Sequence, residues 1–415
     1  MSRPRVIVIG GGPAGIVAAG KAAECGAEAI LLEKGPTLGR KLCICGKGRG
    51  NITNTADLQR FIEAFSPNGK FLYGAFSRFF RDDLLDLLQR YDLKVKTERG
   101  GRVFPVTDHA ADVVHALERW MSSVGVDIRT GFPARSIVVE SGLVVGVVVH
   151  GGIMKANSVV IATGGASYPK TGSTGDGYAL AKEAGHSIIA PEPALSALTT
   201  SEGWVKDLQG LSLRNVRVTL TIDRPDAKQT QIASGFGEML FTHFGVSGPI
   251  ILTLSRSARP YLRSHNLIVS IDLKPGLTEE QLHVRLIRDF AQSRHVGNYL
   301  RALLPRMLID VFLNLAGIAS DTPTNTITSQ QRSRIVSLLK DFRLTATGLR
   351  PLEEAIVTAG GVPTKEIDPT TMMSKLVGGL YFAGEVIDID AETGGFNLQA
   401  AFSTGSVAGG AAAGS

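Results

Sequence analysis

The opening of the chain has the apolar and polar pattern of a strand, a glycine turn, a helix and a second strand. Residues 6–9 are all apolar and predict a short buried strand. Glycines follow at Gly10, Gly12 and Gly15, which is the spacing G-x-G-x-x-G, and a stretch suited to a helix comes next. A second apolar run covers residues 29–32 and ends at an acidic residue. This order is typical of a dinucleotide-binding βαβ unit.

Each part of this unit has a physical reason to hold a pyrophosphate. Gly10 allows a tight turn, Gly12 lets the backbone approach the phosphates without a Cβ, and Gly15 lets the helix pack closely on the strand. The phosphates would lie at the helix N-terminus, where free N–H groups and the helix dipole favour an anion. Glu33 follows Gly15 by eighteen residues and would bind the ribose hydroxyl groups. NAD and FAD both remain open at this point.

The later pattern indicates one α/β domain that is interrupted by another. Residues 1–191 continue with a predicted helical stretch over 71–93, a turn over 98–105, a helix over 110–125, and a β-hairpin through Ser141-Gly142. From residue 192 to residue 345 the sequence pattern changes. In strands such as "VRVTLTID" and "LIVSIDL", apolar and polar residues alternate as in a half-exposed antiparallel sheet.

The interrupting domain contains a mostly helical stretch over about 277–342. Glycine-rich turns return in 346–415, and "GGLYFAGE" predicts a strand that rejoins the first part. We therefore expect a discontinuous Rossmann-like domain, formed by 1–191 and 346–415, with an inserted β-rich substrate domain that carries a helical insertion.

Composition and charge fit a globular protein of more than one domain. The chain has 415 residues, of which 44% are apolar and 20% are charged. The net charge of +6 and the pI near 9.2 permit nucleic acid binding without indicating it. Three cysteines cannot build a disulfide framework. The first apolar run is too short for a signal sequence, and no run approaches the ~18 residues of a membrane span. We expect a cytoplasmic location.

The return of glycine turns favours FAD over NAD. A domain that binds only NAD has no need of a C-terminal strand and turn, whereas FAD must also hold its isoalloxazine ring with contacts from several segments. Three further glycine-rich stretches meet that demand, at residues 39–54, 162–185 and 382–405.

The chain resembles the BaiN/RdsA-type NAD(P)/FAD-dependent oxidoreductases, which include aminoacetone oxidase-like flavoproteins, and more distantly the fumarate reductase flavoproteins. The resemblance covers nearly the whole chain and includes "GRVFPVTDHAADVV", "GEMLFTHFGVSGPIILTLS" and "EEAIVTAGGVPTKEIDPTTM". It implies bound FAD, with Glu33 on the adenosine ribose and the loops at 46–51, 164–177 and 394–401 near the flavin. In one departure, Gly50 stands where the family pattern often has Cys, so no catalytic thiol is expected there.

Several side chains are candidates for contact with the cofactor. Arg40 and Lys41 could offset the pyrophosphate or the negative charge of a reduced flavin, and Glu385 ends a strand where α/β sheets bind ligands. Lys47, Arg49 and Asn54 are weaker candidates, because solvated loop charges and turn chemistry explain them equally well. The expected cofactor-binding residues are Gly10, Gly12, Pro13, Ala14, Gly15, Glu33, Lys34, Arg40, Lys41, Gly46, Gly48, Asn51, Thr53, Ala134, Ala162, Thr163, Gly164, Asp176, Gly384, Glu385, Asn397 and Leu398.

Candidates for catalysis are few. His243 could pass a proton near neutral pH, although a structural role in a turn explains it as well. Tyr168 and Lys170 are candidates for substrate contact. Cys43 and Cys45 are expected to be packed residues and not a redox dithiol. The chain has no zinc, P-loop or serine-hydrolase motif, and no metal is expected.

These observations predict an FAD-dependent oxidoreductase that moves a hydride through flavin N5 on a small organic substrate. The flavin could be reduced by NAD(P)H and pass the hydride to an enone, or an amine could be oxidised with oxygen as acceptor. The chain has no second G-x-G-x-x-G unit, so a nicotinamide would visit only transiently. A flavin-dependent RNA-modifying or RNA-binding protein is the alternative from another class, although only 6% of the residues are aromatic.

Overall fold

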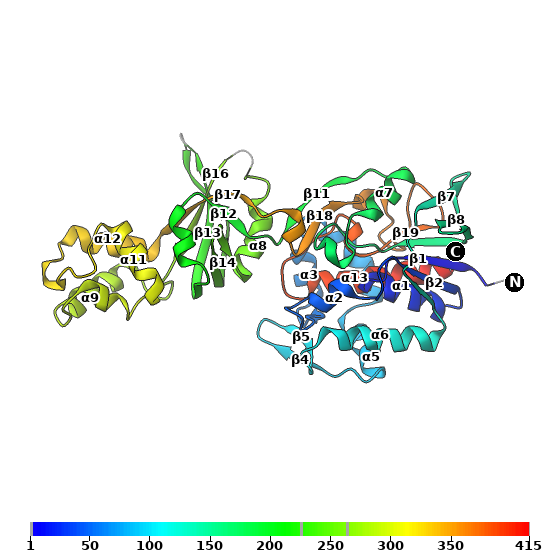
Figure 1. Ribbon diagram of the computed structural model, residues 1–415, viewed down its shortest axis with the longest axis horizontal. Helices are drawn as coiled ribbons and strands as arrows, with labels where there is room; N and C mark the ends of the chain where they lie inside the picture. The colour runs from blue at the N-terminus through cyan, green and yellow to red at the C-terminus, as the bar shows by residue number, and fades with distance from the viewer. Residues whose placement is uncertain (1–2, 225–226, 263–264, 415) are drawn as a thin grey trace. The chain divides into compact units, whose positions relative to one another are not determined.

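The computed structural model describes residues 3–224, 227–262 and 265–414 (Figure 1). The chain forms two compact units. The first unit comprises Met1–Pro193 and Leu352–Ser415, and the second comprises Ala194–Pro351. Each unit has its own apolar core.

The first unit is built on a five-stranded parallel sheet in the order β19-β10-β1-β2-β6. The strands predicted at 6–9 and 29–32 are confirmed as its centre, with every residue from Val6 to Ile9 buried. The C-terminal segment supplies an edge strand. The strands are β1 (Arg5–Ile9), β2 (Glu28–Glu33), β6 (Asp127–Thr130), β10 (Ser158–Ile161) and β19 (Leu380–Phe382).

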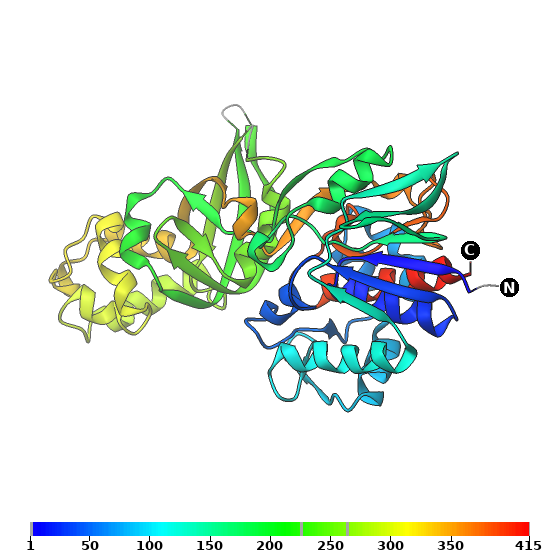
Figure 2. The ribbon, with the colours of Figure 1, turned by 45° about the vertical axis from the view of Figure 1, so that its right-hand side comes forward.

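Two helices from opposite ends of the chain pack against each other beside this sheet. They are α1 (Pro13–Glu24) and α13 (Phe396–Ala413). A Cβ on Gly405 would lie 2.3 Å from the Ala14 carbonyl oxygen, and one on Gly409 would lie 2.1 Å from that of Ala18. The helices therefore approach at backbone distance, which glycine permits. The two chain ends lie at one end of the unit in both Figure 1 and Figure 2.

Smaller elements complete the first unit. Two three-stranded antiparallel sheets have the orders β3-β5-β4 and β7-β8-β9, and β11 pairs with β18. The strands are β3 (Thr53–Asn54), β4 (Val95–Glu98), β5 (Arg102–Pro105), β7 (Ser136–Glu140), β8 (Leu143–Val149), β9 (Gly152–Lys155), β11 (Ile189–Ala194) and β18 (Val357–Gly361). The helices are α2 (Arg40–Ile44), α3 (Leu58–Ala64), α4 (Tyr73–Arg78), α5 (Arg81–Arg90), α6 (Ala110–Val124) and α7 (Asp176–Glu183).

The helical stretch expected over 71–93 is confirmed. It is divided into α4 and α5, because Phe80 is extended and the Asp83 carboxylate accepts its backbone N–H to start a new helix. The next prediction along the chain is correct only in part. The stretch 98–105, expected as a turn, contributes to the hairpin of β4 and β5. Only the middle of this stretch forms a turn, in which Gly100 and Gly101 adopt left-handed conformations.

The second unit is a closed six-stranded antiparallel barrel in the order β12-β15-β14-β13-β16-β17. Apolar residues alternate along its strands, and Leu267, Val269 and Ile271 are fully buried. The strands are β12 (Leu198–Thr200), β13 (Ser212–Arg224), β14 (Ala227–Thr242), β15 (Gly245–Ser247), β16 (Asn266–Asp272) and β17 (Phe342–Leu349). The helix α8 (Pro249–Ala258) packs on β14.

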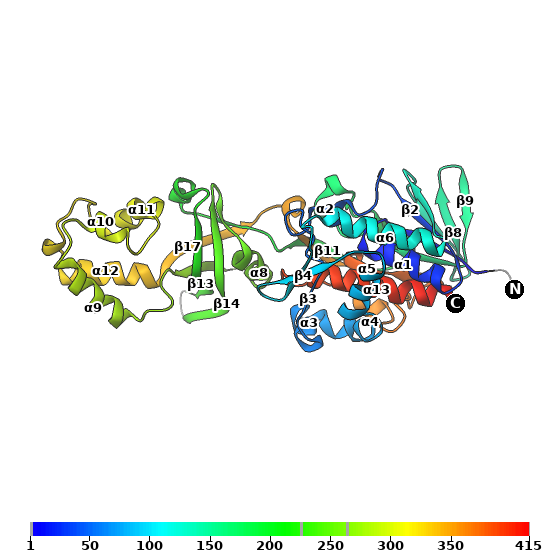
Figure 3. The same cartoon turned by 90° about the horizontal axis from the view of Figure 1, so that it is seen from below.

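The predicted helical insertion is confirmed between β16 and β17 (Figure 3). It consists of α9 (Glu279–Phe290), α10 (Val296–Leu300), α11 (Arg306–Ala316) and α12 (Ser329–Lys340). Thr278 and Thr328 begin α9 and α12 with capping boxes. Within the part of the chain that the structure describes, the helices are all too short or too polar to cross a membrane.

The two units differ in charge. The second unit has nineteen Lys and Arg against twelve Asp and Glu, which gives +7. The remainder of the chain has twenty-five against twenty-six, which gives −1. The excess positive charge of the whole sequence therefore belongs to the second unit.

Candidate functional site

Of the three motif glycines in the turn after β1, only Gly12 has open space beside it. A Cβ on Gly12 would have no atom within 4 Å, whereas one on Gly15 would lie 1.8 Å from the Gly10 carbonyl oxygen. Gly10 has φ +107°, and a Cβ there would lie 2.5 Å from the Ala162 carbonyl oxygen. Gly10 and Gly15 thus serve close packing, and Gly12 borders a space at the N-terminus of α1. A pyrophosphate fits this position, because the N–H groups of the first helical turn lack helical partners.

Glu33 lies beside this turn at the end of β2. Its carboxylate accepts the backbone N–H of Gly11 at 2.7 Å and that of Gly35 at 2.5 Å. Backbone bonds from Gly131 to Gly35 and from Phe132 to Glu33 bring the loop that contains Ala134 alongside. An acceptor fixed in this way suits the ribose of an adenosine, so the residues present fit the adenosine diphosphate half of FAD.

Two contacts join the stretch 34–40 to the stretch 168–176, and both involve predicted residues. The Lys34 ammonium pairs with the Asp176 carboxylate at the start of α7, and the Arg40 guanidinium donates to the Lys170 carbonyl oxygen at 2.6 Å. Lys170 itself is exposed. Tyr168 is half-buried with φ 52°, and burial raises the pKa of its phenol. These contacts hold the stretch 34–40 against the stretch 168–176.

Lys41 and Glu385, which lie 344 positions apart in the sequence, form an ion pair. The Lys41 ammonium lies 2.7 Å from one Glu385 carboxylate oxygen and 2.7 Å from the Ser167 hydroxyl. The other Glu385 oxygen accepts the Thr358 N–H at 2.7 Å and lies 3.3 Å from the Ser167 hydroxyl. Both charged side chains are 19% exposed. This network joins three of the predicted loops and the end of β18.

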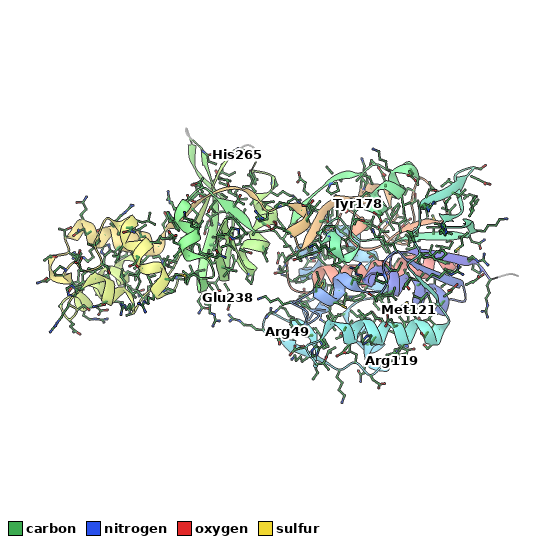
Figure 4. The ribbon with its side chains drawn as sticks, in the orientation of Figure 1. Arg49, Arg119, Met121, Tyr178, Glu238 and His265 are labelled. Atoms are coloured by element: carbon green, nitrogen blue, oxygen red, sulfur yellow. The ribbon has the colours of Figure 1, made fainter. Side chains whose placement is uncertain are left out.

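Tyr178 lies on α7 and is buried (Figure 4). Burial, and next the negative charge of Glu385, hold the pKa of its phenol well above the usual range, so it remains protonated. Thr163 lies close to the same helix, because a Cβ on Gly177 would come within 2.0 Å of the Thr163 hydroxyl. A Cβ on Gly384 would lie 2.8 Å from that of Ala14. The glycines therefore let these segments converge.

The loop over 46–51 is attached to the β4–β5 hairpin through Arg49. Its guanidinium pairs with Glu98 and with Asp108, the latter at 2.7 Å, and lies over the Phe104 ring (Figure 4). Arg49 thus has a structural role in this loop. Lys47 is exposed, and Gly46 and Gly48 have positive φ, as the turn requires.

The amide groups of three asparagines contact the start of α13, which begins at Phe396. Asn51 accepts the Gly395 N–H, and Asn54 donates to the Gly394 carbonyl oxygen. Asn397 accepts the Ala391 N–H and donates to the Ala391 carbonyl oxygen. The side chains of Asn51 and Asn397 are thus engaged with backbone, which leaves the first-turn N–H groups of Asn397 and Leu398 for a ligand.

The remaining predicted residues have other settings. His243 belongs to the second unit, in the turn between β14 and β15, where it is exposed and its ring meets that of Phe244 edge-on at 4.9 Å.

Burial raises the pKa of Cys45 to about 11, and burial also raises that of Cys43. Neither thiol favours the reactive thiolate form. In the described parts of the chain, no group of three His, Cys, Asp or Glu could hold a metal ion.

Ser167 and Thr358 were not among the predicted residues. A signal for Thr358 is present, because "VVIATGG" and "AIVTAGG" both run from an apolar strand through Thr into two glycines. The second copy of this pattern places the Thr358 N–H on Glu385, and its hydroxyl accepts the N–H groups of Ala166 and Ser167.

A parallel sheet with this glycine turn, ribose acceptor and C-terminal return defines an FAD-binding oxidoreductase of the Rossmann type. The chain belongs to the family described as "HI0933-like protein Rossmann domain", whose model matches residues 4–411. It is 31% identical to a 3-dehydro-bile acid delta(4,6)-reductase of Clostridium scindens, over 99% of both chains. It is 29% identical to a ribosomal RNA dihydrouridine synthase of Escherichia coli, over 97% of this chain and 96% of the relative.

Solved structures share the fold at low sequence identity. A Mycobacterium smegmatis Sdh1 complex matches 99% of this chain and 68% of its own, with a TM-score of 0.52 and 17% identity. A 3-ketosteroid-delta4-(5alpha)-dehydrogenase from Rhodococcus jostii matches 99% of this chain and all of its own, with a TM-score of 0.50 and 15% identity. The chain therefore shares its fold with these two proteins.

Proposed function

We propose that this protein is an FAD-dependent reductase of a carbon–carbon double bond that is conjugated to a carbonyl group, in a small organic substrate. The observation that carries the proposal is the cradle in the first unit, in which the space at Gly12, the acceptor Glu33 and the Lys41–Glu385 pair come from separate segments. Bound FAD would supply a hydride from N5 to the electron-poor carbon, and a proton would complete the adjacent carbon.

The roles of the chain's own residues follow from their contacts. The N-terminus of α1 and Gly12 would hold the pyrophosphate, and Glu33 would hold the ribose. Lys41 and Glu385 would keep the loops closed around the middle of the cofactor. The N-terminus of α13 would face the flavin, where its dipole favours the negative charge of the reduced ring.

The names of the relatives support reduction of a conjugated ring bond. The C4–C5 and C6–C7 double bonds of a 3-oxo-4,6-diene steroid are both conjugated to the C3 carbonyl group, and the C5–C6 bond of uracil is conjugated to the C4 carbonyl group. The amine oxidase alternative has no such support. NADPH or NADH is the proposed donor and would bind transiently, since the chain has no second dinucleotide motif.

Reduction of uridine in RNA is the second candidate. The charge of +7 on the second unit favours it, because basic surfaces attract the phosphate backbone. The small-molecule substrate and the RNA substrate differ in salt dependence, which is strong only for RNA.

The test is anaerobic reduction of the holoprotein, followed by a panel of oxidants. Stopped-flow absorbance would record the flavin band after mixing with NADH or NADPH. The reduced protein would then meet a 3-oxo-4-ene steroid, a simple cyclic enone, uridine, and an rRNA transcript. We expect rapid reoxidation by an enone with a saturated product. Reoxidation by the rRNA transcript alone would replace the small-molecule proposal, and failure to bind FAD would overturn both.

A further inference from the structure

The start of α13 is held by β3 on one side. The Asn51 amide oxygen accepts the Gly395 N–H at 3.0 Å, and its nitrogen donates to the Thr53 carbonyl oxygen at 3.2 Å. The Asn54 amide nitrogen donates to the Gly394 carbonyl oxygen at 2.9 Å. Gly394 and Gly395 therefore have one hydrogen bond each to the two ends of the stretch 51–54, which we call the asparagine clamp.

The clamp holds two backbones in close approach. Gly395 has φ +100°, and a Cβ there would lie 2.3 Å from the Thr53 carbonyl oxygen. Thr53 is fully buried and Asn54 is 4% exposed. The Thr53–Asn54 side of the clamp is thus buried while Asn51 is half-buried, and backbone groups would lose their partners if either asparagine were removed.

The opposite side of the same helix start is held by α3. Arg60 pairs with Glu392, just before α13, and its guanidinium lies 5.3 Å from the centre of the Phe396 ring. The rings of Phe61 and Phe396 meet edge-on at 4.7 Å between centres. Contacts on both sides fix the first turn, so the clamp can set the direction of its free N–H groups.

We infer that Asn51 and Asn54 position the flavin. They act through the start of α13 and do not contact the flavin directly. The inference rests on the proposed function, in which this helix end faces the flavin ring. The effect of a helix terminus on a charge falls off within one turn, so a small displacement of the first N–H groups changes how well they stabilise a reduced flavin. The clamp would therefore affect both the affinity for FAD and the reduction potential of the bound flavin.

The experiment compares Asn51→Ala and Asn54→Ala with Asn157→Ala. Asn157 is the matched control, because its side chain accepts the Arg5 N–H at 2.8 Å at the other end of the parallel sheet. The measurements are the melting temperature of the apoprotein, the Kd for FAD by fluorescence titration, and the potential by equilibration with reference dyes. We expect each clamp variant to bind FAD up to about tenfold more weakly, as for one lost hydrogen bond, and at a more negative potential.

The control variant should melt at a lower temperature with an unchanged Kd and potential. Clamp variants that melt lower but keep the Kd and potential of the wild type would overturn the positioning role. A wild-type protein that binds no FAD would instead overturn the proposed function.

Two aspartate variants give a second test if an alanine variant does not fold. Asn51→Asp keeps an acceptor for the Gly395 N–H and loses the donor to the Thr53 carbonyl oxygen. Asn54→Asp keeps the acceptor for the Ala56 N–H but removes the donor to the carbonyl oxygens of Gly394 and Gly100. Each adds one carboxylate to the same stretch. We expect Asn54→Asp to weaken FAD binding more than Asn51→Asp does, and equal Kd values would contradict the clamp.

Discussion

At the scale of single residues, a substitution at Gly12 should separate the proposed cofactor binding from folding. It has extended backbone angles, with φ −84° and ψ −177°, that any residue adopts, and open space lies beside it. Valine at this N-cap position should cost only ~1 kcal/mol of unfolding free energy. Its side chain would occupy the pyrophosphate space, so we expect Gly12→Val to be purified with less than about a tenth of the wild-type flavin. Absorbance near 450 nm and denaturant unfolding measure both effects.

Gly15→Ala is the control for that substitution. Its methyl group would lie 1.8 Å from the Gly10 carbonyl oxygen, so the strand and helix must separate. We expect loss of folded protein and not only of flavin. A Gly12→Val protein with full FAD content would contradict the assignment of the pyrophosphate site.

His243 is a second test at this scale. Because its side chain is exposed in a turn, His243→Asn should change the unfolding free energy by no more than about 0.5 kcal/mol. If His243 transfers a proton to the substrate, the oxidative half-reaction should slow by ~10²–10⁴-fold in this variant. An unchanged rate at several pH values would remove His243 from the catalytic proposal.

His186 makes stability depend on pH. It is 3% exposed, with Glu366 at 2.9 Å and Ser374 at 2.8 Å, and burial lowers its pKa in the folded protein. The unfolded chain binds a proton below its ordinary pKa near 6.5 while the folded protein resists it, so stability falls as the pH falls through that value.

We expect His186→Gln to lose ~1–3 kcal/mol at pH 7.5 through its lost hydrogen bonds. The variant should also show a weaker decline in stability from pH 7.5 to pH 5.5. Urea unfolding at three pH values measures this slope, and a variant as acid-sensitive as the wild type would contradict the role of His186.

At the scale of elements, the contact between α1 and α13 links stability to cofactor binding. Gly409→Ala would place a methyl group 2.1 Å from the Ala18 carbonyl oxygen and force the helices apart. We expect a loss of ~1–3 kcal/mol, typical of overpacking, together with weaker FAD binding because both helix N-termini move. Gly410→Ala is the control, since the nearest atom to a Cβ there is 3.9 Å away. Equal stability of the two variants would contradict this account.

The sequence predicts elements well where local chemistry determines them. The βαβ unit, the hairpin at Ser141-Gly142 and the helical insertion follow from periodicity and turn residues. The break between α4 and α5 depends on one carboxylate competing for the Phe80 N–H, which an apolar pattern does not reveal.

Much of the candidate site depends on contacts between distant positions. Glu33 could be predicted, because its spacing from the glycine turn is local. The pairing of Lys41 with Glu385 could not, because the two residues are distant in sequence and each is a plausible cofactor contact alone. Ser167 carries no motif of its own, so only the folded chain identifies its role.

At the scale of the whole molecule, the residues of the proposed cofactor cradle all belong to one unit. We expect a protein in which residues 194–351 are replaced by a short linker to bind FAD, though more weakly, and to show no turnover. Fluorescence titration with FAD measures this. A chain that ends near residue 193 should not bind FAD, because it lacks β19, Glu385 and α13. Equal FAD binding by that shorter chain would contradict the discontinuous cradle.

The C-terminal position of β19 and α13 also has a consequence for synthesis. Four strands of the sheet leave the ribosome early, but the chain must extend through the 158 residues of the second unit before the edge strand and the last helix emerge. At 5–20 residues per second this interval is roughly 10–30 s. During that time the nascent first unit has its glycine turn and Glu33 but not Glu385 or α13. Cofactor capture should thus wait until β19 and α13 have left the ribosome, and chains that terminate before β19 should remain colourless.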